Sequence, residues 1–192
     1  MTASSGVPGS EVTQRLEREA GSAYLLSFGL RVLWVNEGWR RFARENGAPE
    51  LATAFEAGGA LLEITAEPLR SFYRAAFARV ASSGEPWTHR YECSSAAVFR
   101  KLCMQVSLTP ERGAFVVVHS TVVEMPLGAA GAVDVGAYEN RDGLVIQCAN
   151  CRRVRRPSAE GAWDWVPELV RSPAHNVSHG LCSTCDFLYY SS

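Results

Sequence analysis

Four of the six cysteines form two identical C-x-x-C pairs, Cys148/Cys151 and Cys182/Cys185, separated by 30 residues. This spacing lets two thiolates reach one ion from a single tight turn, and four thiolates complete the tetrahedron that Zn²⁺ accepts in closed structural sites. A module of about 55 residues with little apolar surface is marginal on its own, and a bound metal would supply the missing stability. The sequence therefore predicts a Cys₄ zinc-binding module over residues 137–192.

Other interpretations of these cysteines remain open at this stage. A disulfide framework is disfavoured in a reducing compartment, and a thioredoxin-type redox site is disfavoured by the two copies and by the lack of a βαβ pattern. His179, three residues before Cys182, is an alternative ligand in place of Cys148 or Cys185. With four cysteine ligands, His179 would instead donate to a thiolate or lie in a turn, and His175 would be exposed to solvent.

The composition is that of an ordinary globular protein. Hydrophobic residues make up 47% and charged residues 20% of the 192 residues, which argues against extensive disorder. With a formal net charge of -1, the protein has no overall electrostatic attraction to nucleic acid or anionic lipid. No apolar run reaches about 18 residues, and the beginning, MTASSGVPGSEV, does not resemble a secretion signal. We therefore expect a cytoplasmic protein without a membrane span.

The segment 1–21 is expected to be an N-terminal tail and a short helix. Residues 1–9 are small and polar, whereas Ser10 can cap a helix that Gly21 stops. The apolar positions of this helix step by four and form a narrow stripe, which packs on its own domain or, alternatively, forms a dimer contact. The stripe consists of Val12, Leu16 and Ala20.

Residues 22–125 alternate between strand and helix patterns. Two strands are expected at 22–28 and 31–36, followed by a helix over 37–47, whereas 48–66 has no clear periodicity. A longer helix begins near Pro68, which suits a first-turn position, and its apolar residues recur at steps of three and four. Three β-rich runs then predict an antiparallel meander with one face covered by the helices. These runs are 87–94, 98–108 and 113–125.

The segment 126–136 is small, flexible and nearly uncharged, so we expect it to be a linker between the two domains. Beyond it, the stretch 162–172 predicts a helix with Trp163 on its apolar side. Pro167 weakens that expectation, because a proline past the first turn breaks a helix.

The first domain resembles PAS sensor domains. LWVNEGWRRFARENG is similar to their second strand, which ends in Asn and is followed by a helix with Trp and Phe. FYRAAFARVASSGEPWTHRYEC resembles their long helix leading into the third strand. The resemblance covers about 22–125 and implies an α+β fold, a five-stranded antiparallel sheet with helices on one face. It also implies sensing of a small molecule or pairing with partners.

The PAS resemblance does not identify a ligand. Nothing matches the reactive-cysteine helix of flavin-binding PAS domains, and the long helix lacks a histidine for haem, so we expect neither cofactor. His89 and His119 fall on predicted strands, where a histidine is usually exposed or hydrogen-bonded. Cys93 and Cys103 are expected to be small, buried apolar residues rather than reactive thiols. A fully packed core without a ligand is one possibility.

The C-terminal residues 146–190 resemble a segment found after PAS or receiver domains in bacterial signalling proteins. Its pattern is C-x-x-C-[KR]-x-[IV]-[KR], then Gly and Trp, a helix, SHG, C-x-x-C and a terminal Tyr. The resemblance implies metal ligation by the same four cysteines.

Together these features predict a non-enzymatic signalling module that acts through a protein partner or by dimerising. The alternative is nucleic-acid binding by the zinc module, because CRRVRR places four arginines beside the first cysteine pair. Residues 137–192 nevertheless hold six Arg against six acidic residues, so this patch is local. Arginines beside a Cys₄ centre also offset its negative charge. No nucleophile–base pair or phosphate-binding Gly loop is recognisable, so we do not expect an enzyme. The four arginines are Arg152, Arg153, Arg155 and Arg156.

Overall fold

The structure of the chain is a computed structural model, which describes residues 10–50, 53, 58–65, 67–95, 97–128 and 133–189. The chain forms two compact units. Unit 1 comprises the chain up to Tyr91 together with Leu102–Val122, and unit 2 comprises Glu92–Lys101 and the chain from Val123 on. The expected loose tail 1–9 lies outside the described residues. In the described part of the chain, no helix has the length and apolarity to span a membrane.

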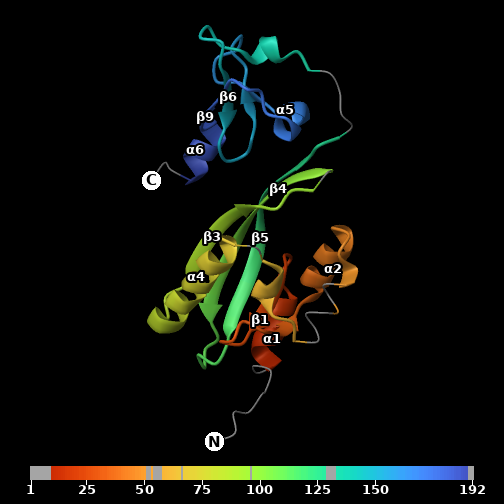
Figure 1. Cartoon of the computed structure of the whole chain (residues 1–192), viewed down its shortest axis with the longest axis vertical. Helices are drawn as coiled ribbons and strands as arrows, with labels where there is room; N and C mark the ends of the chain where they lie inside the picture. The colour runs from red at the N-terminus through yellow and green to blue at the C-terminus, as the bar shows by residue number, and fades with distance from the viewer. Residues whose placement is uncertain are drawn as a thin grey trace, which may run out of the picture. The chain divides into compact units, whose positions relative to one another are not determined.

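Unit 1 is built on a five-stranded sheet with the order β2-β1-β5-β4-β3 (Figure 1). Strand β1 pairs antiparallel with both β2 and β5. This sheet confirms the α+β fold expected from the sequence, and three of its strands, β3, β4 and β5, contribute residues to both units. The strands are β1 (Ala23–Leu26), β2 (Val32–Val35), β3 (Trp87–Glu92), β4 (Val98–Leu108) and β5 (Phe115–Pro126).

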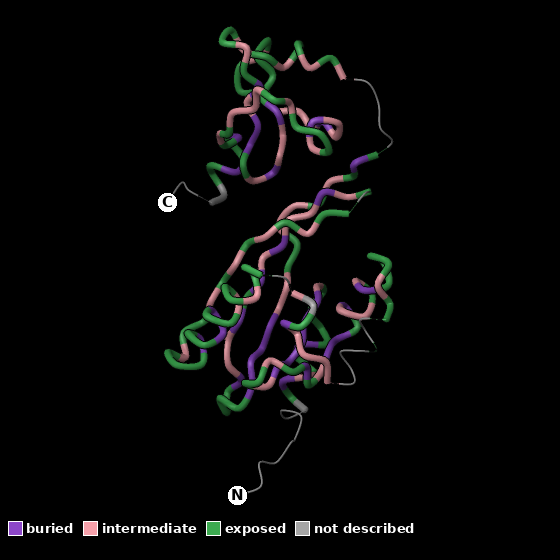
Figure 2. Tube along the Cα trace, in the orientation of Figure 1, coloured by how far each residue is buried: buried purple, intermediate pink, exposed green. Residues whose placement is uncertain are grey.

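Both faces of strand β1 are buried, because its side chains alternate between two clusters (Figure 2). On one face, Leu26 packs with Phe77 and Val80 of helix α4 (Leu69–Ser83). On the other face, Leu25 packs with Leu16 of helix α1 (Ser10–Glu17). Helix α1, which the sequence placed ahead of the domain, therefore covers the face opposite α4.

The packing of α1 uses two of the three residues of its apolar stripe. Val12 is 7% and Leu16 is 1% exposed, and both pack against Ala23, Leu25 and Val116 of the same chain. Ala20 is exposed. The intramolecular alternative thus accounts for the stripe, and the dimer contact stays a prediction.

Asn36 joins β2, α1 and helix α2 (Glu37–Glu45) in the interior of unit 1. Its side chain is fully buried, and its Oδ1 accepts from the backbone N–H of Ala23 at 2.9 Å and of Trp39 at 2.8 Å. Its Nδ2 donates to the carbonyls that follow α1, including Gly21 at 2.9 Å. Asn36 is therefore the N-cap of α2 and satisfies backbone groups that would otherwise be buried without partners.

Unit 2 contains a four-stranded sheet with the order β8-β7-β6-β9. Its small apolar core consists of Val145, Val154, Val166 and Leu169. The elements are the short helices η2 (Val135–Tyr138), α5 (Pro167–Arg171) and α6 (Ser183–Tyr189), and the strands β6 (Val145–Cys148), β7 (Val154–Arg155), β8 (Trp163–Asp164) and β9 (Val177–Gly180). A further 3₁₀ turn, η1 (Leu61–Ile64), belongs to unit 1.

The helix predicted over 162–172 is wrong in its first part. Trp163 and Asp164 form strand β8, paired with β7, and the helix begins only at Pro167. Proline is tolerated there because the first turn of a helix has no partner for the missing N–H.

The first residues of the expected linker are packed within unit 2. Leu127 is buried, and its N–H donates to the carbonyl of Ala97 at 2.8 Å. Trp165 Nε1 donates to the carbonyl of Pro126 at 2.8 Å, and the Trp165 ring lies 5.6 Å from that of the fully buried Phe99. Residues 129–132 of the expected linker lie outside the described part.

Candidate metal centre

The parallel pairing of β6 and β9 brings the two cysteine pairs together. Cys148 ends β6 opposite Gly180, which ends β9. Because parallel strands end at the same edge of a sheet, the turns that follow them start side by side. Cys151 lies in the turn after β6, whereas Cys182 and Cys185 lie at the start of α6.

The four cysteine sulfurs form one compact group. All four Sγ atoms lie within 4.8 Å of one another, and those of Cys151 and Cys182 are 3.7 Å apart. Four sulfurs placed tetrahedrally at about 2.3 Å from one zinc ion would be about 3.8 Å apart. The four thiols are at most 4% exposed, and none is in a disulfide. The group can hold a metal such as zinc.

Donors around the cysteines favour their thiolate forms. Asn150 Nδ2 donates to the sulfur of Cys185 at 3.3 Å, and an Arg153 guanidinium N–H approaches that of Cys151 at 3.9 Å. Burial raises the pKa of the Cys148 thiol, but backbone N–H groups, that of Cys151 first, outweigh it and lower the pKa to about 7. Burial raises the pKa of Cys151. A metal cation among the sulfurs would instead lower the pKa of these thiols, because it binds the thiolates directly.

The two histidines near the second cysteine pair lie outside the cluster. His179 is exposed on β9, opposite Gln147, and His175 is exposed as well. Among the described residues, the group of possible metal ligands consists of the four cysteines. Cys93 and Cys103 lie elsewhere and are half-buried. Burial raises the pKa of Cys93, which agrees with the expectation of an unreactive thiol.

Three of the four arginines beside the first cysteine pair have partners within unit 2. Arg152 pairs with Glu92 at 3.2 Å, and Arg153 approaches Cys151. Arg156 forms two hydrogen bonds with the carboxylate of Asp164, at 2.7 and 2.6 Å. Arg155 is exposed. The sequence could not assign these partners, because Glu92 is 60 residues from Arg152.

Unit 1 holds a second candidate site, an aromatic cavity of about 290 Å³ between the sheet and its helices. His119 forms one wall, and its ring nitrogens bind the hydroxyls of Tyr24 at 3.1 Å and Tyr91 at 2.7 Å. Burial lowers the pKa of His119 to about 4, so the wall is uncharged at neutral pH. The expectation of a hydrogen-bonded strand histidine fits His119. The cavity is lined by Tyr24, Trp39, Phe42, Leu61, Leu62, Thr65, Tyr73, Phe77, Tyr91, Met104 and His119.

Comparisons with known proteins yield similarities to solved structures. No protein-family model matches the sequence, and no curated protein matches it. Among solved structures, the chain is similar to one titled "Structure of the PAS domain from Bordetella pertussis BvgS", with a TM-score of 0.45 and 13% sequence identity. The similarity covers 60% of this chain and 88% of that chain. At this level it carries no argument about function.

Proposed function

We propose that the chain is a non-enzymatic bacterial signal-transduction module. In this proposal the PAS-like unit 1 senses a small molecule or docks a protein, and unit 2 is stabilised by a structural zinc ion and contacts a protein partner. The observation that carries the proposal is the buried group of four cysteines. Four thiolates fill the coordination shell of zinc, so such a site leaves no position for a substrate and serves the fold rather than catalysis.

The aromatic cavity supports the sensing role of unit 1. Its volume of about 290 Å³ lies near the low end of the range typical of small-molecule sites. His119 and Tyr24 in its wall are uncharged at neutral pH, because burial lowers the pKa of His119 and raises that of Tyr24. A cavity of this kind suits a small, uncharged, largely apolar molecule.

The pairing of the arginines favours protein partners over nucleic acid. A phosphate-binding surface needs basic side chains that are available to phosphates, whereas Arg152 and Arg156 bind acidic side chains of their own unit. Arg153, beside a thiolate, offsets the charge of the metal centre. Retardation of a generic duplex at low salt would restore the nucleic-acid alternative.

Metal analysis of the full chain tests the zinc assignment. Native mass spectrometry and elemental analysis should find one zinc ion per chain. Cys182→Ser should lose that ion, whereas the matched control Cys103→Ser, which changes a half-buried thiol outside the cluster, should keep it. A protein without a stoichiometric metal, or with the two pairs joined in disulfides, would contradict the proposal.

Amide hydrogen exchange tests whether the metal serves the fold. Cys182→Ser should lose protection in β6 and β9, while β1 in unit 1 keeps it. Concerted loss of protection in both units would contradict the idea that zinc stabilises unit 2 on its own.

A further inference from the structure

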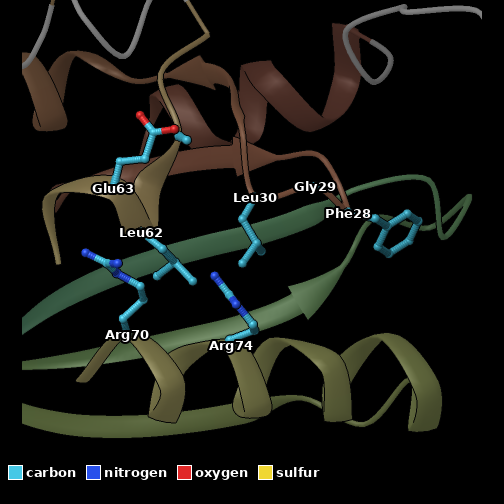
Figure 3. Close-up of a pocket in the computed structure, with 8 residues that line it drawn as sticks. Phe28, Gly29, Leu30, Leu62, Glu63, Arg70 and Arg74 are labelled. Atoms are coloured by element: carbon cyan, nitrogen blue, oxygen red, sulfur yellow. The ribbon is translucent and has the colours of Figure 1, made fainter. Parts of the chain in front are cut away.

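A second cavity in unit 1 has a different chemical character from the aromatic one. It has a volume of about 360 Å³ and lies between the β1–β2 turn, η1 and the first half of α4 (Figure 3). One part of its lining is apolar, and the other part carries two arginines from consecutive turns of α4. The lining consists of Phe28, Gly29, Leu30, Ala60, Leu62, Glu63, Arg70 and Arg74.

The two arginines of this cavity come from one side of α4, because they are four residues apart on the helix. Figure 3 shows both side chains rising from α4, with the Arg74 guanidinium between Leu62 and Leu30 and that of Arg70 on the other side of Leu62. Arg70 Nε donates to the carbonyl of Thr65 at 2.9 Å, which holds the side chain in place and leaves its other N–H groups for a ligand.

Acidic groups near the arginines set the charge that the cavity can accept. The carboxylate of Glu63 points away from Arg70 and Arg74 in Figure 3. Glu67 is exposed and influenced by the charge of both arginines, but its carboxylate accepts hydrogen bonds from the N–H and the hydroxyl of Ser71. The two carboxylates therefore offset only part of the positive charge of the two arginines. The remaining charge suits a ligand with one negative charge better than a phosphate group, which carries nearly two negative charges.

The apolar walls define the rest of the ligand. Leu30 adopts a φ of 57°, rare for a leucine, and its carbonyl accepts from the N–H of Leu61 at 3.0 Å, which joins the turn to η1. Phe28 packs edge-to-face on Phe115 with ring centroids 5.2 Å apart, yet its side chain is 51% exposed. A hydrocarbon group in the cavity would cover apolar surface that is otherwise open to water.

We propose that this cavity binds a small amphipathic carboxylate. Arg70 and Arg74 hold the carboxylate by charge-assisted hydrogen bonds, and Phe28, Leu30 and Leu62 contact its hydrocarbon part. The site is separate from both the cysteine cluster and the wall formed by His119, so it goes beyond the function proposed above.

Calorimetric titration of the full, metal-loaded chain with octanoate tests the proposal. We expect saturable binding that weakens about tenfold or more in Arg74→Gln, since a hydrogen bond to a charged group is lost. Arg79→Gln is the matched control, because it removes the same charge from an exposed position of α4 outside the cavity. Arg70→Gln should weaken binding similarly, and thermal unfolding establishes that each variant is folded. Arg74→Lys keeps the charge and should bind better than Arg74→Gln.

Three kinds of outcome would overturn the assignment. The first is the absence of saturable octanoate binding below about 10 mM. The second is equal binding of octanamide, which has the same chain without the charge, or equal binding by the wild type and Arg74→Gln. The third is tighter binding of octyl phosphate, which would replace the carboxylate by a phosphate.

Discussion

Acidification should destabilise unit 1 through His119. Burial lowers the pKa of this histidine from 6.5 to about 4. The unfolded chain keeps a histidine pKa of about 6.5, so below that pH it binds a proton that the folded chain does not. The free energy of unfolding therefore falls as the pH drops from about 6.5 to about 4, and it is unaffected above that window. The full loss, from a pKa difference of roughly 2.5, is about 3 kcal/mol.

A comparison of the wild type with His119→Gln separates the titration of His119 from the loss of a bound metal at low pH. Protonation of the cysteines would weaken the proposed metal binding equally in both proteins, whereas only the wild type carries the titrating ring. Urea unfolding at about pH 7.5 and about pH 4.5 should show the wild type losing about 2.5 kcal/mol more than the variant. A titration of the His119 ring by nuclear magnetic resonance measures the pKa directly.

Equal losses in the two proteins would refute the reasoning. So would a measured pKa near 6.5, because it would mean that the ring is hydrated. The cavity wall would then be charged in mildly acidic solution, and a neutral ligand would no longer be the best match for it.

Two further predictions concern the packing of unit 1. Asn36→Ala removes five hydrogen bonds of a fully buried side chain and should lower the free energy of unfolding by more than about 3 kcal/mol, measured in urea, whereas the exposed Asn46→Ala should cost less than about 1 kcal/mol. Leu16→Ala empties a position that is 1% exposed and should cost about 2–5 kcal/mol without changing the mass found by light scattering. A halved mass would instead support the dimer contact along α1.

The strands and long helices of unit 1 are predictable from the sequence because their patterns are repetitive. Eleven residues of alternating character specify β4, whose observed bounds are those expected, and α4 follows steps of three and four along its length. The pattern fails at one place in β4. Alternation along 98–108 places Phe99 on the same face as Lys101, Gln105 and Ser107, yet Phe99 is fully buried because it meets Trp165 in unit 2. A contact across 66 residues leaves no trace in local alternation.

Unit 2 is harder to predict, although the structure does bring its four cysteines into one group. Strands β7 and β8 have two residues each, too few to show any period, and β9 carries no apolar alternation. The predicted helix includes Trp163, because an aromatic residue fits the apolar stripe of a helix as well as it fits the apolar face of a strand. The partner of Arg156, Asp164, lies in the missed strand β8, whereas the partner of Arg152, Glu92, lies 60 residues away in β3.

The same shortness is the reason why we propose that this unit depends on its cysteines. Four aliphatic side chains form its core, and the next buried cluster is the cysteine group itself, packed against Val123 and Trp163. In the absence of a metal, four buried thiols close to one another give little stability. Backbone N–H groups lower the pKa of Cys148, whereas burial raises that of Cys151. A bound metal would add four metal–sulfur bonds to this cluster. Lys101 donates to the carbonyl of Ala149 in the first cysteine turn at 3.0 Å, so in the proposed zinc-bound state the ordering of that turn would extend to the first residues of β4.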